Sequence, residues 1–230
     1  MPYFFWDSTL LILIPGILLA LFAQSYVSST YRKYSAVATH GGLPAHTVAR
    51  RILDDAGLHG VQVEPTAGHL TDHYDPRARV LRLSEGVYGS SSISALGIAA
   101  HEAGHAIQHG KGYAFLKVRN AIFPVVRIAS SLAIPLLLAG LLLEVAALYD
   151  VALILYATAI VFQLITLPVE FNASRRAMAE IRGGGLMAPD EADGAQKVLT
   201  AAAMTYVAAL AQSVMTLLYY ITRFGSRNDR

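Results

Sequence analysis

Long runs of apolar residues constrain this chain more than any other feature of its sequence. The first run covers residues 9–27, about the length that an α-helix needs to cross the hydrocarbon core of a bilayer. Two further runs cover residues 122–143 and 151–167, and an alanine-rich run covers residues 198–221. Hydrophobic residues make up 54% of the chain and charged residues 15%, which is too apolar for an ordinary soluble domain. The sequence therefore predicts a mainly α integral membrane protein with about four membrane helices.

The first apolar run is predicted to be an uncleaved anchor. A cleavable signal peptide would carry Lys or Arg before its apolar run, whereas the first basic residues here, Arg32 and Lys33, follow it. Residues 32–119 contain ten Lys and Arg residues and residues 175–197 contain four, but the turn at residues 144–150 contains none. Because basic residues collect on the cytoplasmic side of a membrane, both polar segments are predicted to face the cytoplasm.

The topology of the last apolar run stays open. Four complete spans would place the C-terminal tail on the far side of the membrane, although the tail carries three arginines (Arg223, Arg227 and Arg230). Either the last run does not cross, or the basic tail is tolerated outside the cytoplasm.

Charge and cysteine content argue against nucleic-acid binding and rule out cysteine-based structural and metal sites. The formal net charge is only +2 and the basic residues form no continuous run, so a nucleic-acid partner is not expected. The chain has no cysteine, so a disulfide framework and a thiolate metal site are both impossible. Any metal must therefore bind nitrogen and oxygen ligands.

The polar segment after the first run begins with a short helix and two strands. A helical pattern opens at Pro44 and stops at Gly57. Residues 60–64 and 79–83 alternate like short strands, and the stretch between them, GHLTDHYDPRA, is rich in turn residues. This pattern predicts a hairpin of the two strands with a long connection.

A second, more apolar helix is predicted over residues 93–109. The serines at residues 90–92 offer an N-cap, and Gly110 is expected to be the C-cap. The second leg of the later hairpin of spans is expected to end at Pro168 and Glu170, and a flexible Gly183-Gly184-Gly185 follows it. The predicted organisation has five parts: an N-terminal anchor (1–30), a cytoplasmic catalytic region (31–120), a membrane helical hairpin (121–169), a third-ligand helix and polar segment (170–197), and a C-terminal membrane helix with a basic tail (198–230).

The second helix carries the sequence His101-Glu102-Ala103-Gly104-His105, an HExxH motif. Histidines at positions i and i+4 lie on one helical face, so both imidazoles can reach one zinc ion. Glu102 lies at the edge of that face, where it can accept a proton from the water that attacks the substrate. A chance pentapeptide on a buried helix is the alternative, but ionisable groups in a helix rich in Ala, Ile and Gly are costly to place there. The motif predicts a small cytoplasmic α+β region of the zincin type.

A third zinc ligand must come from elsewhere in the chain, because a catalytic zinc takes three protein ligands and leaves the fourth position to water. The metzincin pattern is disfavoured, because Gln108 and Lys111 stand where it needs glycine and histidine. Glu170 is the preferred candidate, since it is predicted at the same membrane depth as the end of the HExxH helix. The alternative is that Glu170 anchors a span end and pairs with Arg175 or Arg176. Two further carboxylates remain in reserve, Glu180 and Glu191.

Several other polar residues allow two interpretations each. His109 lies a further turn along the face of His105 and either joins the zinc site or is a helix-end histidine favoured by the helix dipole. The cluster Asp72, His73, Tyr74 and Asp75 either supports an imidazole or an oxyanion, or makes local turn hydrogen bonds. Arg175 and Arg176 are predicted to mark the cytoplasmic end of a membrane span and not to be catalytic residues.

The chain also resembles a known family. The stretches that carry the resemblance are LTDHYDPRARVLRLSEGVYGSSS, AAHEAGHAIQHGKGYAFLKVRNA, LPVEFNASRRA and GAQKVLTAAAMTYVAA, and they occur in this order over nearly the whole chain. They are similar to the YugP-type family of membrane zinc metallopeptidases. The resemblance implies a neutral, multi-pass zinc peptidase of the bacterial inner membrane.

A broader likeness to HtpX-type proteases implies that the glutamate after a hydrophobic hairpin, here Glu170, is the third ligand. HtpX-type enzymes carry an aspartate four residues later. This chain has Ser174 there, so the resemblance does not favour a role for residue 174 in supporting a metal ligand.

The predicted function is that of a zinc endopeptidase with one Zn²⁺ per chain, bound by His101, His105 and Glu170, with Glu102 as general base. Its expected partners are a protein or peptide substrate, which is misfolded or associated with the membrane, and the lipid bilayer itself; no oligomeric state is predicted. The first alternative is an inactive scaffold or adaptor that keeps zinc for structure, with all four positions filled by protein. The second is a metal transporter, which would carry ionisable residues inside its spans.

Overall fold

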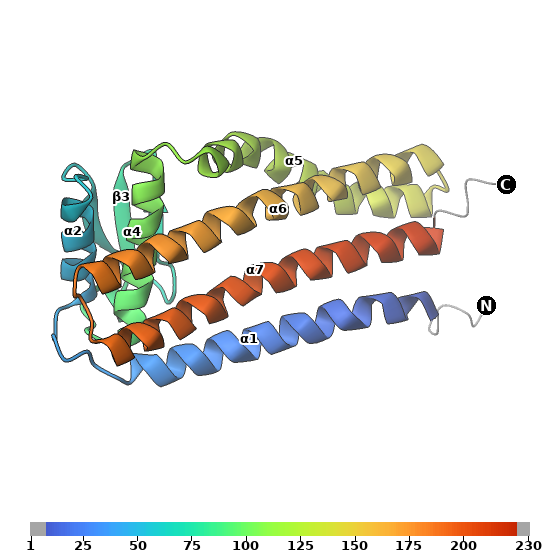
Figure 1. Cartoon of the computed structure of the whole chain (residues 1–230). Helices are drawn as coiled ribbons and strands as arrows, with labels where there is room; N and C mark the ends of the chain where they lie inside the picture. The colour runs from blue at the N-terminus through green and yellow to red at the C-terminus, as the bar shows by residue number, and fades with distance from the viewer. Residues whose placement is uncertain (1–7, 225–230) are drawn as a thin grey trace. The chain divides into compact units, whose positions relative to one another are not determined.

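The computed structural model describes residues 8–224 and divides into two compact units. Unit 1 comprises Met1–Gln24, Val118–Leu167 and Met204–Arg230, and unit 2 comprises Ser25–Lys117 and Pro168–Ala203. The elements in chain order are η1 (Ser8–Leu13), α1 (Ile14–Ser35), α2 (Ala45–Asp55), β1 (Gln62–Thr66), β2 (His73–Asp75), β3 (Val80–Ser84), α3 (Glu85–Tyr88), α4 (Ile93–Gly110), α5 (Ala114–Leu142), α6 (Ala146–Gly183) and α7 (Pro189–Phe224), as Figure 1 shows. Arg227 and Arg230 of the basic tail lie outside the described residues.

Four helical segments within residues 8–224 are long and apolar enough to cross a membrane: Ser8–Ser35, Ala114–Leu142, Ala146–Gly183 and Pro189–Arg223. Many of their large apolar side chains are exposed, among them Leu18, Leu138 and Ile154, as helices in contact with lipid require. The prediction of a mainly α membrane protein with about four membrane helices and a small α+β region is confirmed.

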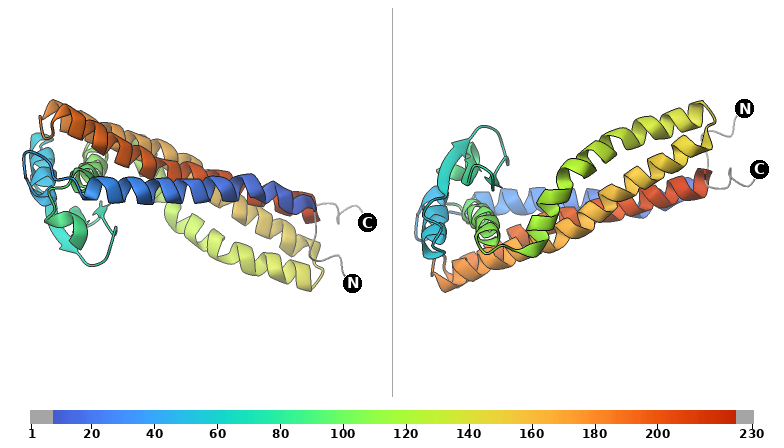
Figure 2. Two further views of the ribbon diagram at one scale, coloured as in Figure 1. Left: turned by 90° about the horizontal axis from the view of Figure 1, so that it is seen from below. Right: turned by 90° about the horizontal axis from the view of Figure 1, so that it is seen from above.

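The helices of unit 1 approach one another at small residues. A β-carbon at Gly16 of α1 would lie 3.1 Å from the Cα atom of Gln212 in α7, and one at Gly140 of α5 would lie 2.8 Å from the backbone nitrogen of Tyr149 in α6. Small residues at such crossings let helix backbones pack closely where lipid supplies no hydrophobic drive between helices. Figure 2 shows the α5–α6 hairpin, coloured from green through yellow to orange, and the turn between the two helices includes Glu144 with a positive φ of 56°.

One predicted boundary of this hairpin was wrong. The turn is shorter than residues 144–150, because α6 already begins at Ala146. The helix itself does not stop where the second leg is expected to end, since α6 continues through Pro168 to Gly183. Proline removes one helical hydrogen bond, but Val169 and Glu170, which follow it, are buried within unit 2. The hydroxyl of Tyr113 also donates to the Pro168 carbonyl (3.4 Å).

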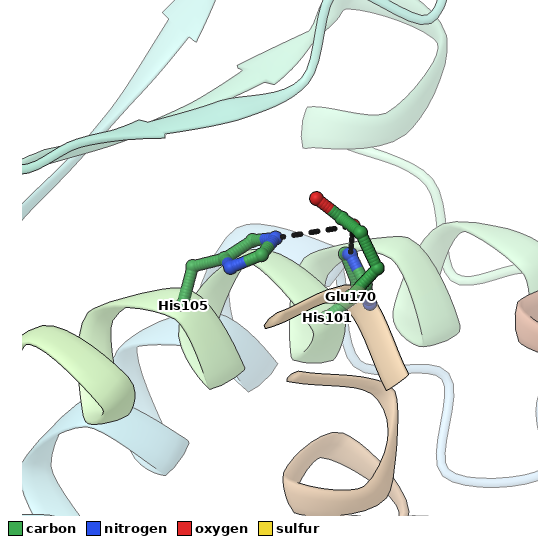
Figure 3. Close-up of side chains that lie close together, drawn as sticks. All are labelled: His101, His105 and Glu170. Atoms are coloured by element: carbon green, nitrogen blue, oxygen red, sulfur yellow. Dashed lines mark hydrogen bonds and ion pairs between the residues drawn. The ribbon is translucent and has the colours of Figure 1, made fainter. Parts of the chain in front are cut away.

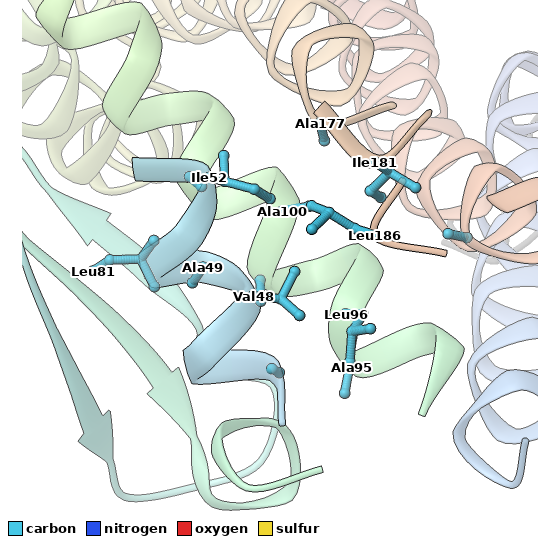
Figure 4. Close-up of a cluster of buried hydrophobic side chains, with 14 of the residues drawn as sticks. Val48, Ala49, Ile52, Leu81, Ala95, Leu96, Ala100, Ala177, Ile181 and Leu186 are labelled. Atoms are coloured by element: carbon cyan, nitrogen blue, oxygen red, sulfur yellow. The ribbon is translucent and has the colours of Figure 1, made fainter. Parts of the chain in front are cut away.

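Unit 2 has a compact core around α4. Figure 4 shows α2 side chains, including Val48 and Ile52, against Leu96 and Ala100 of α4, with Ile181 of α6 nearby. These side chains are almost completely shielded from solvent. The apolar periodicity predicted for α2 is confirmed, and Gly57 adopts the positive φ of 72° that ends this helix region.

A three-stranded sheet in the order β1-β3-β2 completes unit 2 within the described residues. The predicted hairpin of residues 60–64 with 79–83 was wrong, because β1 and β3 pair in parallel. The true hairpin joins β2 to β3, which are antiparallel. Its turn is closed by the Asp75 carboxylate, which accepts hydrogen bonds from the backbone N–H groups of Arg77 (2.8 Å) and Ala78 (3.1 Å).

Candidate metal centre

Helix α4 places the HExxH motif between two well-defined caps. The Ser92 hydroxyl accepts a hydrogen bond from the Ala95 N–H (3.2 Å), as predicted for the N-cap. The predicted C-cap at Gly110 is wrong by one residue, since Lys111 is the C-cap. The chain turns at Gly112, whose positive φ of 65° allows the Tyr113 N–H to reach the Gln108 carbonyl (2.9 Å).

The side chains of His101, His105 and Glu170 converge (Figure 3). The Glu170 Oε2 atom lies 3.3 Å from His101 Nε2 and 3.6 Å from His105 Nε2. The two imidazole rings are 4.7 Å apart and nearly perpendicular. Among the described residues these three form the one group of histidine, aspartate and glutamate side chains whose donor atoms all lie within 4.8 Å of one another.

The approach of α6 to α4 depends on Gly104, which lies between the two histidines of the motif. A β-carbon at Gly104 would lie 2.5 Å from the carbonyl oxygen of Ala173, closer than packed atoms allow. Glycine here lets the α6 backbone approach the motif directly. Glu170 is three residues from this crossing, so its carboxylate reaches both imidazoles.

Each histidine directs Nε2 toward Glu170 and has a hydrogen-bond partner at Nδ1. His105 Nδ1 is 3.0 Å from Oε1 of Gln108, and His101 Nδ1 is 3.1 Å from the Ser174 hydroxyl. Such partners orient imidazoles that bind metals. The resemblance did not favour a supporting role for residue 174, but the Ser174 hydroxyl lies within hydrogen-bond distance of the His101 ring.

The carboxylates of the site raise the pKa of His105. Burial by itself would lower this pKa, but the contact with Glu170 and the negative charge of Glu102 outweigh burial. The nearby carboxylates therefore favour the protonated form of the His105 imidazole. Glu102 itself is buried on α4 and lies close enough to act electrostatically on His105.

The remaining candidates lie outside this cluster. The Tyr74 hydroxyl is 2.9 Å from His109 Nδ1, which pairs the end of α4 with β2. Asp72 accepts hydrogen bonds from the backbone N–H (2.8 Å) and the hydroxyl (2.9 Å) of Ser84. His73 contacts the Thr71 carbonyl (2.8 Å) and Asp75 caps the β2–β3 turn, so these two make local turn contacts, whereas Asp72 binds a residue twelve positions away.

Glu191, a reserve candidate for the third ligand, has a structural role instead. It accepts hydrogen bonds from the backbone N–H groups of His40 (2.6 Å) and Ala188 (2.8 Å), and so caps the start of α7. Arg176 donates to the side-chain oxygen of Asn172 (2.8 Å). Sequence reasoning missed Gln108, Asn172 and Ser174, although a glutamine three residues after His105 in an apolar helix shares the face of that histidine and was a usable signal.

Comparison with known proteins agrees with this geometry. A family model described as "Putative neutral zinc metallopeptidase" matches residues 9–225. The chain belongs to this family. It is also 50% identical over 211 residues to a Bacillus subtilis (strain 168) protein named "Putative membrane protease YugP", with 92% of this chain and 94% of that protein covered. The resemblance to the YugP-type family is confirmed, and no solved structure matches the chain.

Proposed function

We propose that this chain is a zinc-dependent endopeptidase of the membrane, which hydrolyses peptide bonds in membrane-associated or misfolded proteins. The observation that carries the proposal is the convergence of His101, His105 and Glu170 from two helices onto one point. Membership in a family described as zinc metallopeptidases supports it.

The three side chains suit zinc in their chemistry. Two imidazole nitrogens and one carboxylate oxygen are a common donor set of catalytic zinc sites, which keep a further position open. Both imidazoles turn Nε2 toward Glu170, and their Nδ1 atoms are engaged by Gln108 and Ser174. We infer that these three residues hold one Zn²⁺ per chain.

Zinc, when bound, lowers the pKa of a water ligand to about 7 and polarises a carbonyl oxygen. Glu102 is proposed as the general base. Its carboxylate would take the proton of the attacking water and deliver it to the amine nitrogen as the peptide C–N bond breaks. The position of Glu102 next to His101, within electrostatic reach of His105, supports this role.

The membrane helices support a substrate and a location. Glu170 follows the apolar run of α6 by only three residues in the sequence, so substrates held at the bilayer surface are expected. The concentration of Lys and Arg in residues 32–119 and 175–197 favours a catalytic region, including residues 31–120, on the cytoplasmic side of the bacterial inner membrane.

Hydrolysis of casein by the detergent-purified protein tests the proposal, with zinc measured by mass spectrometry on the same samples. We expect Glu102→Gln to keep about one zinc per chain while hydrolysis falls by roughly 10²-fold or more. The matched control Glu85→Gln changes an exposed glutamate of α3 and should leave both values unchanged. Full activity of Glu102→Gln would contradict the role of Glu102. Zinc binding without hydrolysis of casein or membrane proteins would favour a zinc-stabilised scaffold.

A further inference from the structure

Gln108 is a fully buried polar side chain that the proposed reaction does not use. It lies on α4, one turn beyond His105, and none of its surface is exposed. Burying an amide is costly unless its donors and acceptor are satisfied. Its amide contacts His105 Nδ1 (3.0 Å), the Val169 carbonyl (2.7 Å) and the Asn172 side-chain oxygen (3.0 Å).

The orientation of the Gln108 amide follows from partners that can only accept or can only donate hydrogen bonds. The carbonyl of Val169 can only accept, so the atom facing it must be the amide nitrogen. The guanidinium of Arg176 can only donate, so Asn172 must turn its oxygen toward Arg176 and toward Gln108. Gln108 therefore presents its oxygen to His105.

This orientation determines the tautomer of His105. An amide oxygen can only accept, so His105 Nδ1 must carry a proton. Neutral His105 then has its free lone pair on Nε2, the atom that faces Glu170. The Ser174 hydroxyl can donate or accept, so it leaves both tautomers open to His101.

The same amide holds the helical turn that carries Glu170. Its two donated hydrogen bonds go to Val169 and Asn172, one residue before Glu170 and two residues after it. This turn follows Pro168, which has no N–H to donate along the helix. The missing hydrogen bond lies on the side of the proline toward residue 164, and the two bonds from Gln108 are contacts to the following turn from outside α6.

We propose that Gln108 is a positioning residue of the metal centre. Its single amide commits His105 to the tautomer with a free Nε2 and fixes the α6 turn of Glu170 against α4. The inference rests on the proposed function, because it concerns the same zinc site. Glutamine suits the position because it combines an acceptor with two donors on a side chain long enough to reach α6.

The test measures zinc affinity by chelator competition and the visible absorption of the Co²⁺-substituted protein. Gln108→Met has nearly the same shape and removes all three hydrogen bonds. It should weaken zinc binding by about 10–100-fold and alter the spectrum at saturating Co²⁺. Gln108→Glu keeps the acceptor for His105 but loses the amide donors, so its affinity should lie between those of wild type and Gln108→Met. The control Gln196→Met changes a partly exposed glutamine of α7 and should bind as wild type does.

The outcomes separate this proposal from the proposed function. Circular dichroism confirms that each variant is folded, and the Co²⁺ spectrum reports the coordination geometry of the folded fraction. A folded Gln108→Met protein with wild-type affinity and spectrum overturns the positioning role. Failure of the wild-type chain to bind zinc overturns the proposed function as well.

Discussion

The two units differ in what their large apolar side chains face. In unit 2, Ile52 and Leu96 are almost wholly enclosed by protein. In unit 1, Leu138 is 52% exposed and Ile154 is 67% exposed, and the buried residues are mostly small, such as Ala133. The core of unit 2 is stabilised by removing apolar surface from water, whereas unit 1 leaves that surface for lipid and packs through small residues. The three residues of the candidate metal centre all belong to unit 2.

The sharpest test of this contrast changes the same residue type in each unit. Ile52→Ala should lower the free energy of unfolding by about 2–5 kcal/mol, because it leaves a cavity in a closed core. Ile154→Ala removes an exposed side chain and should change the free energy of unfolding by no more than about 0.5 kcal/mol. Denaturation of both variants in the same detergent measures the difference. Equal costs would refute the distinction between the two units.

A smaller effect is expected where the helices of unit 2 cross. Gly104→Ala places a methyl group against the Ala173 carbonyl and should cost about 1–3 kcal/mol by overpacking. It should also reduce zinc binding, since α6 must move away from the two histidines. Gly183→Ala is the control, because a β-carbon there meets nothing within 4 Å. Wild-type stability and zinc affinity of Gly104→Ala would show that the close crossing is not needed.

Polar contacts between helices of unit 1 should contribute less. The Gln163 amide donates to the Ser213 hydroxyl (2.9 Å), which links α6 to α7. Ser213→Ala is expected to lower the free energy of unfolding by about 0.6 kcal/mol, the average for hydrogen bonds between membrane helices. Denaturation in detergent measures it, and a loss as large as that of Ile52→Ala would mean that unit 1 depends on polar packing.

The smallest effect concerns pH and the β2–β3 turn of unit 2. Backbone N–H groups of Ala78 and Arg77 hold the pKa of the Asp75 carboxyl below its usual value. A lowered pKa in the folded state means that this group stabilises the fold above the unfolded-state pKa, and that the contribution is lost as pH falls below about 4. Asp75→Asn should therefore reduce the difference in melting temperature between pH 7 and pH 3 slightly. An unchanged difference would contradict the role assigned to the turn.

Local sequence patterns predicted the helices and the convergent residues better than they predicted the strand pairing. Helix α4 was predictable because its serine cap and its motif lie within one segment, and Glu170 because it follows an apolar run that folds back as a hairpin. The pairing of β1 with β3 was not predictable, because parallel partners are set by the tertiary fold. In addition, the three residues of β2 lie in a stretch whose composition is typical of turns.

The contacts that support the site were also missed, for a physical reason. Ser174 and Asn172 act on α4 only because Gly104 lets α6 approach so closely, and nothing local to either residue reveals that crossing. The continuation of α6 through Pro168 likewise depends on contacts made elsewhere in unit 2.

The identity of the third ligand is the central claim, and zinc content tests it most directly. Glu170→Gln and Glu180→Gln make the same change at two glutamates of α6, and each purified protein is analysed for zinc per chain in one detergent. We predict that Glu170→Gln loses most of its zinc while Glu180→Gln keeps about one zinc per chain, as wild type does. Retention of zinc by Glu170→Gln together with its loss from Glu180→Gln would contradict the account.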